Sequence, residues 1–430
     1  MDATTYQDYV NILHEELVPA MGCTEPIAIA YAAAVARQTL GRPAQRMEVE
    51  ASGNIIKNVK SVFVPNTGGL RGIPAAAAAG MAAGDPALEL EVLSSIGEGE
   101  QAAIRQYLAD TPIAVKLADS PFIFDIVIRA WAGEDSALVR IVNYHTNIVR
   151  VERNGQVLKE VEAQAAAEEG LTDKSVLTVE GILEFAREAA LADVEEAVGR
   201  QVRYNTAIAQ EGLRGDYGAN IGKVLLATYG DDVKIRAKAM AAAGSDARMN
   251  GCGLPVVIVS GSGNQGLTAS LPVVEYAKEL GADWETTLRA VLVSDLVTIH
   301  LKAEIGRLSA YCGAVSAGCG SGAGIAWLYG REKEPQALLK DVSHTIVNAL
   351  AVDSGIVCDG AKASCAAKIA SAVDAGLLGF YMYQNGQQFR GGDGIISKGV
   401  EQTIRNIGLL ATQGMRETDR EILDIMTTRC

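Results

Sequence analysis

Histidine and clustered positive charge are both scarce in this sequence. Four histidines among 430 residues leave little material for a histidine-based zinc site. Lys and Arg form no cluster that could follow a phosphate backbone, and the formal net charge is -14 at pH 7. The summed electrostatic field therefore repels polyanions. We expect no nucleic-acid partner.

Long apolar stretches are also missing. Hydrophobic residues make up 49% of the chain, but no run of 18 or more apolar residues occurs. The first residues, "MDATTYQDYV", are acidic and polar, whereas a secretory signal begins with basic residues and continues with an apolar stretch. We expect no transmembrane helix, no membrane partner and a cytoplasmic location.

Cysteine is sparse, and its positions carry information. The odd number of seven and the wide spacing argue against a disulfide framework, and thiolates would have to supply most ligands of any metal. Soft thiolates favour iron-sulfur clusters, zinc or Cu(I). A role as a small buried hydrophobe is the alternative for any single cysteine. The seven are Cys23, Cys252, Cys312, Cys319, Cys358, Cys365 and Cys430.

The length fits two domains, and the sequence pattern changes along the chain in agreement with this. Residues 5–40 read as one or two helices that "GCTEP" interrupts, and 72–84 as an alanine-rich helix. Short β-type runs occupy 45–53, 60–69, 122–131 and 137–162, with a hairpin signal at Asn154-Gly155. Small-residue helices follow to the end. We predict an α+β fold: an N-terminal mixed α/β-sheet domain over 1–170, then a mostly helical domain over 171–430, with the boundary near 165–175.

Six ordered motifs extend over nearly the whole chain. In order they read "AMGCTEP", "HTNIV", "SDARM", "SGSGNQG", "RLSAYCGA" and "CDGAKASCAAK". Together they resemble the L-cysteine desulfidase family, relatives of the alpha chain of bacterial iron-sulfur L-serine dehydratases. The resemblance implies a serine dehydratase alpha-chain-like helical domain and an oxygen-sensitive [4Fe-4S] cluster. It also implies conversion of L-cysteine to pyruvate, ammonia and sulfide without pyridoxal phosphate.

The resemblance assigns roles to the cysteines. Cys358 and Cys365 match the pair that holds the cluster in the dehydratases, and Cys312 looks like the third ligand. Cys319 also resembles a dehydratase cysteine, so the third ligand is either Cys312 or Cys319. Cys23 in "GCTEP" is a family feature that serves either as a ligand or as an acid/base. Some relatives end in cysteine, but nothing beside Cys430 supports such a role, and a frayed terminus is the alternative.

The implied reaction also needs a base and a site for an amino acid. Leaving one iron without a protein thiolate makes it a Lewis acid for the β-substituent of the substrate. His145 is the candidate acid/base, because a neutral imidazole suits proton transfer near pH 7. Glu25 and Cys23 compete for this role. A purely structural role is the alternative for a histidine at the end of a β run.

The loop "SGSGNQG" is typical of a nest of backbone amides that could hold the substrate carboxylate. Its candidate side chains are Ser262, Asn264 and Gln265. Arg248 in "SDARM" contacts either the substrate or Asp246. A further polar group, in "GNIIKN" and "PNTGGLRG", could close over the site from the first domain.

Three rival interpretations remain open. The nearest is an L-serine dehydratase on the same scaffold, and "GCTEP" and "CDGAKASC" favour cysteine over serine. A non-catalytic iron-sulfur sensor would need no base. A protein whose cysteines are simply core would hold no metal. The expected partner is a small amino acid, and the sequence leaves a homodimer open.

Overall fold

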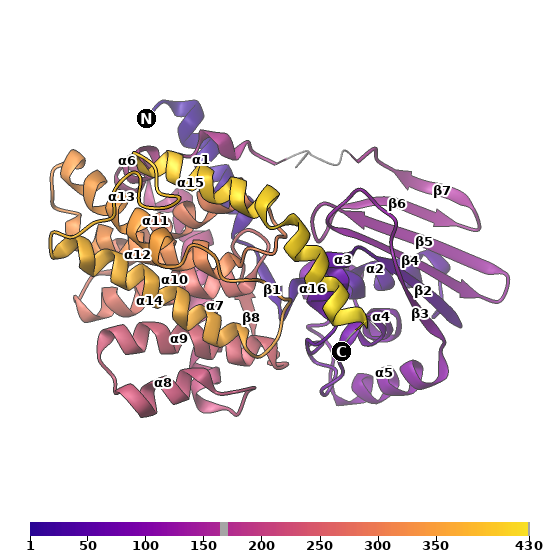
Figure 1. The fold of residues 1–430 in the computed structure, drawn as a ribbon. Coiled ribbons are helices and arrows are strands. Elements are labelled where there is room, and N and C mark those ends of the chain that lie inside the picture. Colours follow the sequence, from indigo (N-terminus) through magenta and orange to yellow (C-terminus); the bar gives the residue numbers. More distant parts are fainter. Residues whose placement is uncertain (164–170, 429–430) are drawn as a thin grey trace.

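The computed structural model describes residues 1–163 and 171–428, and shows a sheet-containing half and a helical half (Figure 1). The first half holds helices on a six-stranded sheet. Its elements are α1(Ala3–Glu16), β1(Pro19–Met21), α2(Thr24–Leu40), β2(Arg46–Ala51), α3(Gly53–Val59), α4(Gly72–Ala83), η1(Pro86–Glu91), α5(Glu98–Asp110), β3(Ile113–Leu117), β4(Asp125–Ala132), β5(Asp135–Val142), β6(Ile148–Arg153) and β7(Gln156–Glu160).

The second half is almost entirely helical. Its elements are η2(Lys174–Val176), α6(Val179–Glu188), α7(Leu191–Arg214), α8(Ile221–Tyr229), α9(Val233–Met249), β8(Pro255–Val257), α10(Gly263–Glu279), α11(Trp284–Ile305), α12(Gly313–Gly330), α13(Pro335–Val352), α14(Cys365–Gln384), α15(Val400–Leu409), η3(Leu410–Gly414) and α16(Arg416–Thr428). The predicted α+β class is therefore confirmed. The predicted boundary falls partly on 164–170, outside the described residues, and the division into two domains stays a prediction.

The sheet has the order β3-β2-β4-β5-β6-β7, in which only β2 and β3 pair in parallel. Asn154 and Gly155 connect β6 to β7 with φ of 52° and 78°, which confirms the predicted hairpin. The predicted β run over 60–69 is wrong, since it contributes only an isolated bridge between Phe63 and Arg71. Pro65, followed by Asn66 with φ of 56°, breaks the extended path there.

Small residues let helices of both halves approach closely. A Cβ atom on Gly80 of α4 would lie 1.9 Å from the carbonyl oxygen of Ala30 in α2, so only glycine fits. In the helical half, α12 is buried among α10, α11, α13 and α14. A Cβ on Gly376 of α14 would lie 2.1 Å from the carbonyl oxygen of Gly318 in α12. This contact fixes the spacing of the two helices.

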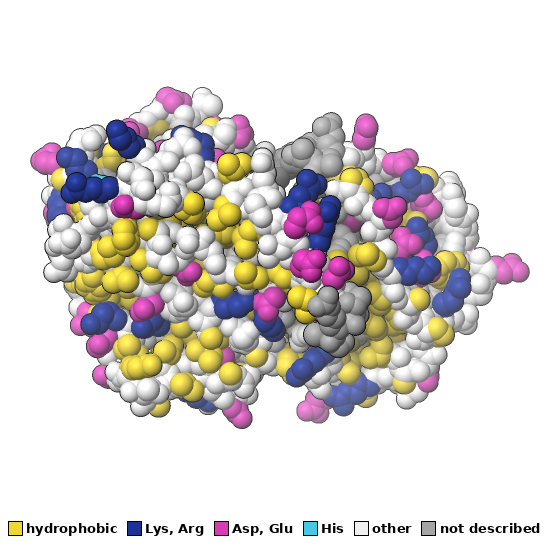
Figure 2. All heavy atoms as spheres, viewed as in Figure 1, with side chains coloured by type: hydrophobic (Ala, Val, Ile, Leu, Met, Phe, Trp, Pro, Cys, Tyr) yellow, Lys and Arg dark blue, Asp and Glu magenta, His cyan; other side chains and the backbone are white. Residues whose placement is uncertain are grey.

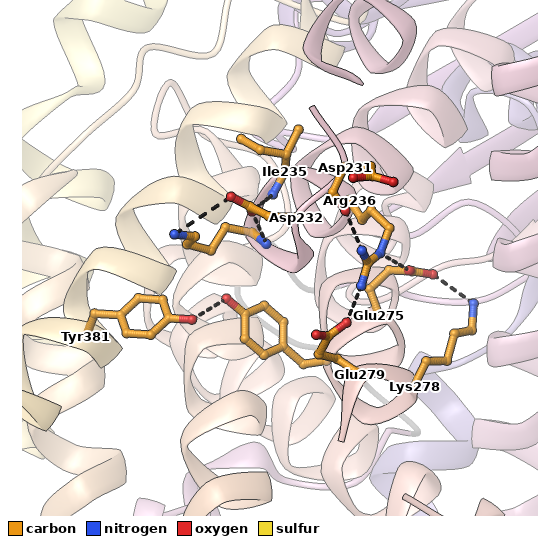
Figure 3. Close-up of polar contacts among 10 residues, drawn as sticks. Asp231, Asp232, Ile235, Arg236, Glu275, Lys278, Glu279 and Tyr381 are labelled. Carbon is orange, nitrogen blue, oxygen red and sulfur yellow. Dashed lines mark hydrogen bonds and ion pairs between the residues drawn. The ribbon is translucent and has the colours of Figure 1, made fainter. Parts of the chain in front are cut away.

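Polar contacts at the outer end of this bundle join α9, α10 and α14 (Figure 3). Arg236 forms ion pairs with Glu275 and Glu279, and the hydroxyls of Tyr276 and Tyr381 lie 2.8 Å apart. By length and composition alone α14 could cross a membrane, but 56% of its apolar window is buried inside the protein. Core helices of globular proteins pass the same test.

The two terminal helices each reach the other half of the chain. α1 packs on α7 and α11, and the N-terminal amine pairs with Glu184 of α6 at 2.7 Å. α16 extends toward the sheet half and contacts α3 (Figure 1). A short antiparallel pair, β1 with β8, connects the halves near the site described next.

Candidate active site

A cavity of about 110 Å³ lies where the two halves meet. The sheet half supplies the start of α2, α3 and the loop between β5 and β6. The helical half supplies the starts of α10, α12 and α14 and the loops before them. The lining side chains include Cys23, Glu25, Asn54, Asn58, Phe124, His145, Arg248, Ser262, Asn264, Gln265, Lys302, Arg307, Tyr311, Cys312, Cys358, Cys365 and Lys368.

Cys312, Cys358 and Cys365 line this cavity. Cys312 precedes α12, Cys365 begins α14, and Cys358 lies in the loop between α13 and α14. Backbone pairing brings the first two segments together: Cys312 N donates to the Ile356 carbonyl at 2.9 Å, and Cys358 N donates to the Ala310 carbonyl at 2.7 Å. These main-chain hydrogen bonds bring Cys312 and Cys358 together although they are far apart in the sequence.

Of the three cysteines, Cys358 has the surroundings that favour thiolate. Hydrogen bonding from the Cys312 thiol lowers the pKa of Cys358 against the opposing effect of burial, with help from Lys57 and the Gly360 amide. The same contact and burial raise the pKa of Cys312. Burial raises the pKa of Cys365. One of the paired sulfurs is thus ready to ionise, and the others would follow when a cation binds.

The cysteines fit an iron-sulfur cluster better than a single ion. Among the described residues, no three or more His, Cys, Asp or Glu side chains are arranged to hold one metal ion. A cluster makes a different demand, because each thiolate binds its own iron and the ligands stand apart. Lys302 and Lys368 line the same cavity and offset thiolate charge. Burial lowers the pKa of Lys302 to about 8.

Cys23 and Glu25 line the same cavity from the start of α2, and Cys365 packs against the apolar cluster that contains Cys23. The Cys23 thiol donates to Glu25 Oε2 at 3.0 Å, and Asn58 Nδ2 donates to Oε1 at 2.8 Å. Burial and the neighbouring carboxylate raise the pKa of Cys23 well above its usual value. Burial opposes ionisation of Glu25, but His145 and the Cys23 thiol leave its pKa lowered. A neutral thiol therefore faces a carboxylate.

His145 is buried beside this pair. Its ring packs edge-on against Phe124, with centroids 4.8 Å apart, and its Nε2 atom has no hydrogen-bond partner among the described residues. Burial lowers the pKa of His145 to about 4, although Glu25 acts in the other direction. The imidazole is therefore neutral near pH 7, with one nitrogen available to a ligand.

The first turn of α10 and Arg248 form the remaining wall. A tight turn with positive φ at Ser260 and Gly261 leads into Ser262, which precedes α10. Arg248 is 3% exposed, and a Cβ on Gly263 would lie 2.3 Å from its Nε, so glycine makes room for the guanidinium. A buried cation beside free helix amides favours an anion.

Six buried polar atoms at this cavity have no protein partner among the described residues. A cavity that holds so many unused donors and acceptors is built for a polar ligand. The atoms are Asn54 Oδ1, His145 Nε2, Arg248 Nε, Asn264 Oδ1, Gln265 Oε1 and Tyr311 OH.

Some predicted residues lie elsewhere. Cys319 is buried in the core of α12 and is not part of the cavity lining. Asp246 accepts a hydrogen bond from the Gly222 amide at 3.1 Å, and within the described residues it forms no ion pair with Arg248. From the polar group weighed above, "GNIIKN" reaches the site through Asn54 and Asn58, whereas Asn66 bonds the Leu93 carbonyl. Cys430 lies outside the described residues.

Several lining residues were not predicted from the sequence. Arg307 and Tyr311 belong to the quoted motif "RLSAYCGA", so the motif itself was the available signal. Lys302 and Phe124 lie in apolar stretches of the sequence that belong to none of the six motifs. Arg307 is held by Glu16, whose Oε1 lies 2.7 Å from its Nη2.

Comparison with known proteins places the chain in a family. Residues 87–424 match the serine dehydratase alpha chain family. A UPF0597 protein of Desulfitobacterium hafniense is 58% identical over 425 residues, covering 99% of this chain and 97% of the relative. The chain belongs to the UPF0597 family. UPF0597 proteins of Lachnoclostridium phytofermentans and Treponema denticola are 51% and 45% identical, each with 98% or more of both chains covered.

This UPF0597 protein thus contains a serine dehydratase alpha chain-like region. The matched region includes His145, Arg248 and the three cavity cysteines, but it begins after Cys23 and Glu25. The relatives' names state no activity. A dehydratase or related lyase is the class of enzyme that the matched region suggests.

Proposed function

We propose that this protein is an iron-sulfur-dependent L-cysteine desulfidase, which converts L-cysteine to pyruvate, ammonia and sulfide. The observation that carries the proposal is the meeting of Cys312, Cys358 and Cys365 in one cavity with the Cys23–Glu25 pair and Arg248. When bound, a [4Fe-4S] cluster held by three thiolates supplies a Lewis-acidic iron for the leaving sulfur of the substrate.

Arg248 and the α10 amides hold the substrate carboxylate. The buried guanidinium has no ion-pair partner among the described residues, and Ser262, Asn264 and Gln265 stand at the same helix start. A carboxylate placed there satisfies both the charge and the free amides. Glu25, with its three donors Cys23, Thr24 and Asn58, presents a fixed negative charge to the substrate ammonium.

Neutral His145 takes the Cα proton through its free Nε2 nitrogen. Glu25 favours the resulting imidazolium, because opposite charges attract strongly in a buried site. Loss of sulfide then gives aminoacrylate, which tautomerises to the imine, and water releases pyruvate and ammonia. Cys23, which donates to Glu25 from the same cavity, is the competing acid/base.

L-serine dehydratase activity is the second candidate, because the family match is to the serine dehydratase alpha chain. The motifs "GCTEP" and "CDGAKASC", which resemble the desulfidase family, favour cysteine. A non-catalytic iron-sulfur sensor is the alternative outside enzymes. A cytoplasmic location and a homodimer stay predictions.

The test is product release by anaerobically purified and iron-sulfur-reconstituted protein, with L-cysteine and L-serine in parallel. We expect equal amounts of sulfide and pyruvate from L-cysteine. The Cys358→Ala variant, treated identically, is the control for cluster-independent chemistry. Pyruvate from L-serine alone would favour the dehydratase over the proposed desulfidase. Release of no product from either amino acid would favour the non-catalytic sensor.

A further inference from the structure

A second cavity, of about 490 Å³, adjoins the candidate active site on the side of α16. We call it the α16 chamber. It is lined by α16, the segment 305–310 and side chains of the sheet half. Five side chains line both cavities and so form the wall between them: Asn54, Phe124, Arg307, Leu308 and Ser309.

The charged side chains of the α16 chamber are three arginines and one aspartate. Asp419 is already engaged by Lys57 and by Asn54 Nδ2, the latter at 3.0 Å. Arg420 pairs with Glu417 at 2.8 Å, and Arg307 with Glu16. Of these four charged side chains, Arg416 is the one that forms no ion pair within residues 1–163 and 171–428. The chamber lining therefore contains an unpaired positive charge, although the net charge of the chain is -14.

The position of Arg416 strengthens this preference for an anion. Arg416 is the first residue of α16, where the helix dipole is positive and free amides point outward. The two carboxylates of this first turn are already paired, Glu417 with Arg420 and Asp419 with Lys57, so the amides and the exposed Arg416 side chain remain open to an anion. Met415, Ile123 and Phe124 also line the chamber and suit the short aliphatic part of a ligand.

A third cavity, of about 380 Å³, shares His145, Gly261 and Arg307 with the candidate active site, and the charge of its lining is of the opposite sign. Besides Arg307, which pairs with Glu16, its charged lining consists of carboxylates: Glu15, Glu16, Glu89 and Glu91. Such a lining repels carboxylates. Of these two approaches to the site, only the α16 chamber favours an acid.

We propose that the α16 chamber is the entry subsite of the enzyme, where Arg416 holds the carboxylate of an incoming small amino acid before it passes Arg307. The inference rests on the proposed function in taking an amino acid as the substrate. The ligand class is narrower than a general anion, because the chamber combines one free guanidinium with an apolar wall.

Binding of L-alanine tests the subsite without turnover, since alanine has no leaving group. Saturation-transfer NMR is applied to Arg248→Gln protein, whose inner carboxylate site is disabled. We expect the alanine signal to persist there, to disappear in Arg248→Gln/Arg416→Gln, and to persist in Arg248→Gln/Arg405→Gln. Arg405 is a matched control, an exposed arginine on α15 outside the chamber. Ethylamine, which lacks the carboxylate, should give no signal.

Equal alanine signals in the two double variants, or none in Arg248→Gln alone, would overturn the proposal. In the active enzyme, Arg416→Gln should lower kcat/KM by roughly 3- to 10-fold and leave kcat unchanged. The effect should shrink at high salt. Because the alanine measurement needs no catalysis, it remains readable even if no sulfide is released.

Discussion

At the residue scale, Cys358 and Cys365 differ from Cys252 and Cys319 in what surrounds them, and Cys312 shares a hydrogen bond with Cys358. Cys358 is influenced by Lys57 and Lys362, and Cys365 by Lys362 and Lys368. Cys252 and Cys319 are packed within the hydrophobic core instead. Cationic neighbours stabilise thiolate, whereas apolar ones keep the thiol neutral and inert.

This difference predicts which cysteines hold iron. Cys312→Ala, Cys358→Ala and Cys365→Ala should each lose the visible absorbance of the reconstituted cluster, and activity should fall to background. Cys252→Ala and Cys319→Ala should keep both. Iron and sulfide content of the purified variants checks this. A full cluster in any of the first three would remove that residue from the ligand set.

His145 makes stability depend on pH. Burial lowers its pKa in the folded protein to about 4, below the usual value near 6.5 in the unfolded chain. The unfolded chain therefore binds more protons between these values, and stability falls as the pH drops through this window. We expect His145 to account for about 2 kcal/mol of lost stability at pH 5 relative to neutral pH.

Chemical denaturation at pH 7 and pH 5 measures the effect. His145→Asn, which cannot titrate, should lose about 2 kcal/mol less than the unmodified protein between the two pH values. His14→Asn, at an exposed histidine, should behave like the unmodified protein. Identical pH dependence in His145→Asn would show that the buried imidazole is not the titrating group.

The residue scale also shows what the sequence could predict. Cys358 and Cys365 are seven positions apart and separated by a loop, so their closeness was foreseeable. Cys312 reaches them only through the bridge between Tyr311 and Val357, a long-range pairing that local patterns do not encode. That Cys312 lines the cavity while Cys319 lies in the core of α12 depends on this long-range pairing.

At the element scale, α12 and α14 carry two of the cysteines at their first turns, so the spacing of these helices sets the spacing of the sulfurs. Gly376→Ala should drive them apart, because its Cβ would lie 2.1 Å from the Gly318 carbonyl oxygen. We expect a loss of about 1–3 kcal/mol in stability and incomplete cluster incorporation. Denaturation and iron content measure the two effects.

Ser371→Ala is the matched control, since Ser371 lies on the exposed face of the same helix. It should change neither quantity. If Gly376→Ala incorporated a full cluster at reduced stability, the helix spacing would matter for folding but not for the sulfur positions.

Element types were more predictable than their partners. The Asn154-Gly155 hairpin and the alanine-rich α4 follow from local turn and helix preferences. The run over 60–69 has strand-like composition, but Pro65 and the left-handed Asn66 turn it back on itself. Cys23 occupies the capping position of α2, and the neighbouring Thr24, a better capping residue by type, donates to the Gly261 carbonyl at 3.0 Å instead. Tertiary contacts decided these cases.

At the scale of the whole molecule, the chain ends tie the two halves together around the site. α1 packs on helices of the helical half, and α16 packs on α3 of the sheet half. Figure 2 shows Lys and Arg side chains beside Asp and Glu side chains over α16, where it crosses between the halves. No local sequence pattern predicts which half each terminal helix packs against, because an amphipathic helix can cover either half.

The ion pair between Lys57 and Asp419 is the link that we expect to matter most. Lys57 is 2% exposed, so Asp419→Ala would leave a buried ammonium without its carboxylate. We expect a loss of about 1–3 kcal/mol in stability and faster proteolysis within α16. Glu417→Ala, on the same helix but solvent-exposed, should change stability by less than about 0.5 kcal/mol. Denaturation and timed proteolysis compare the two variants. Equal behaviour would mean that apolar contacts such as Leu423 against Gly53, rather than this ion pair, hold α16 across the halves.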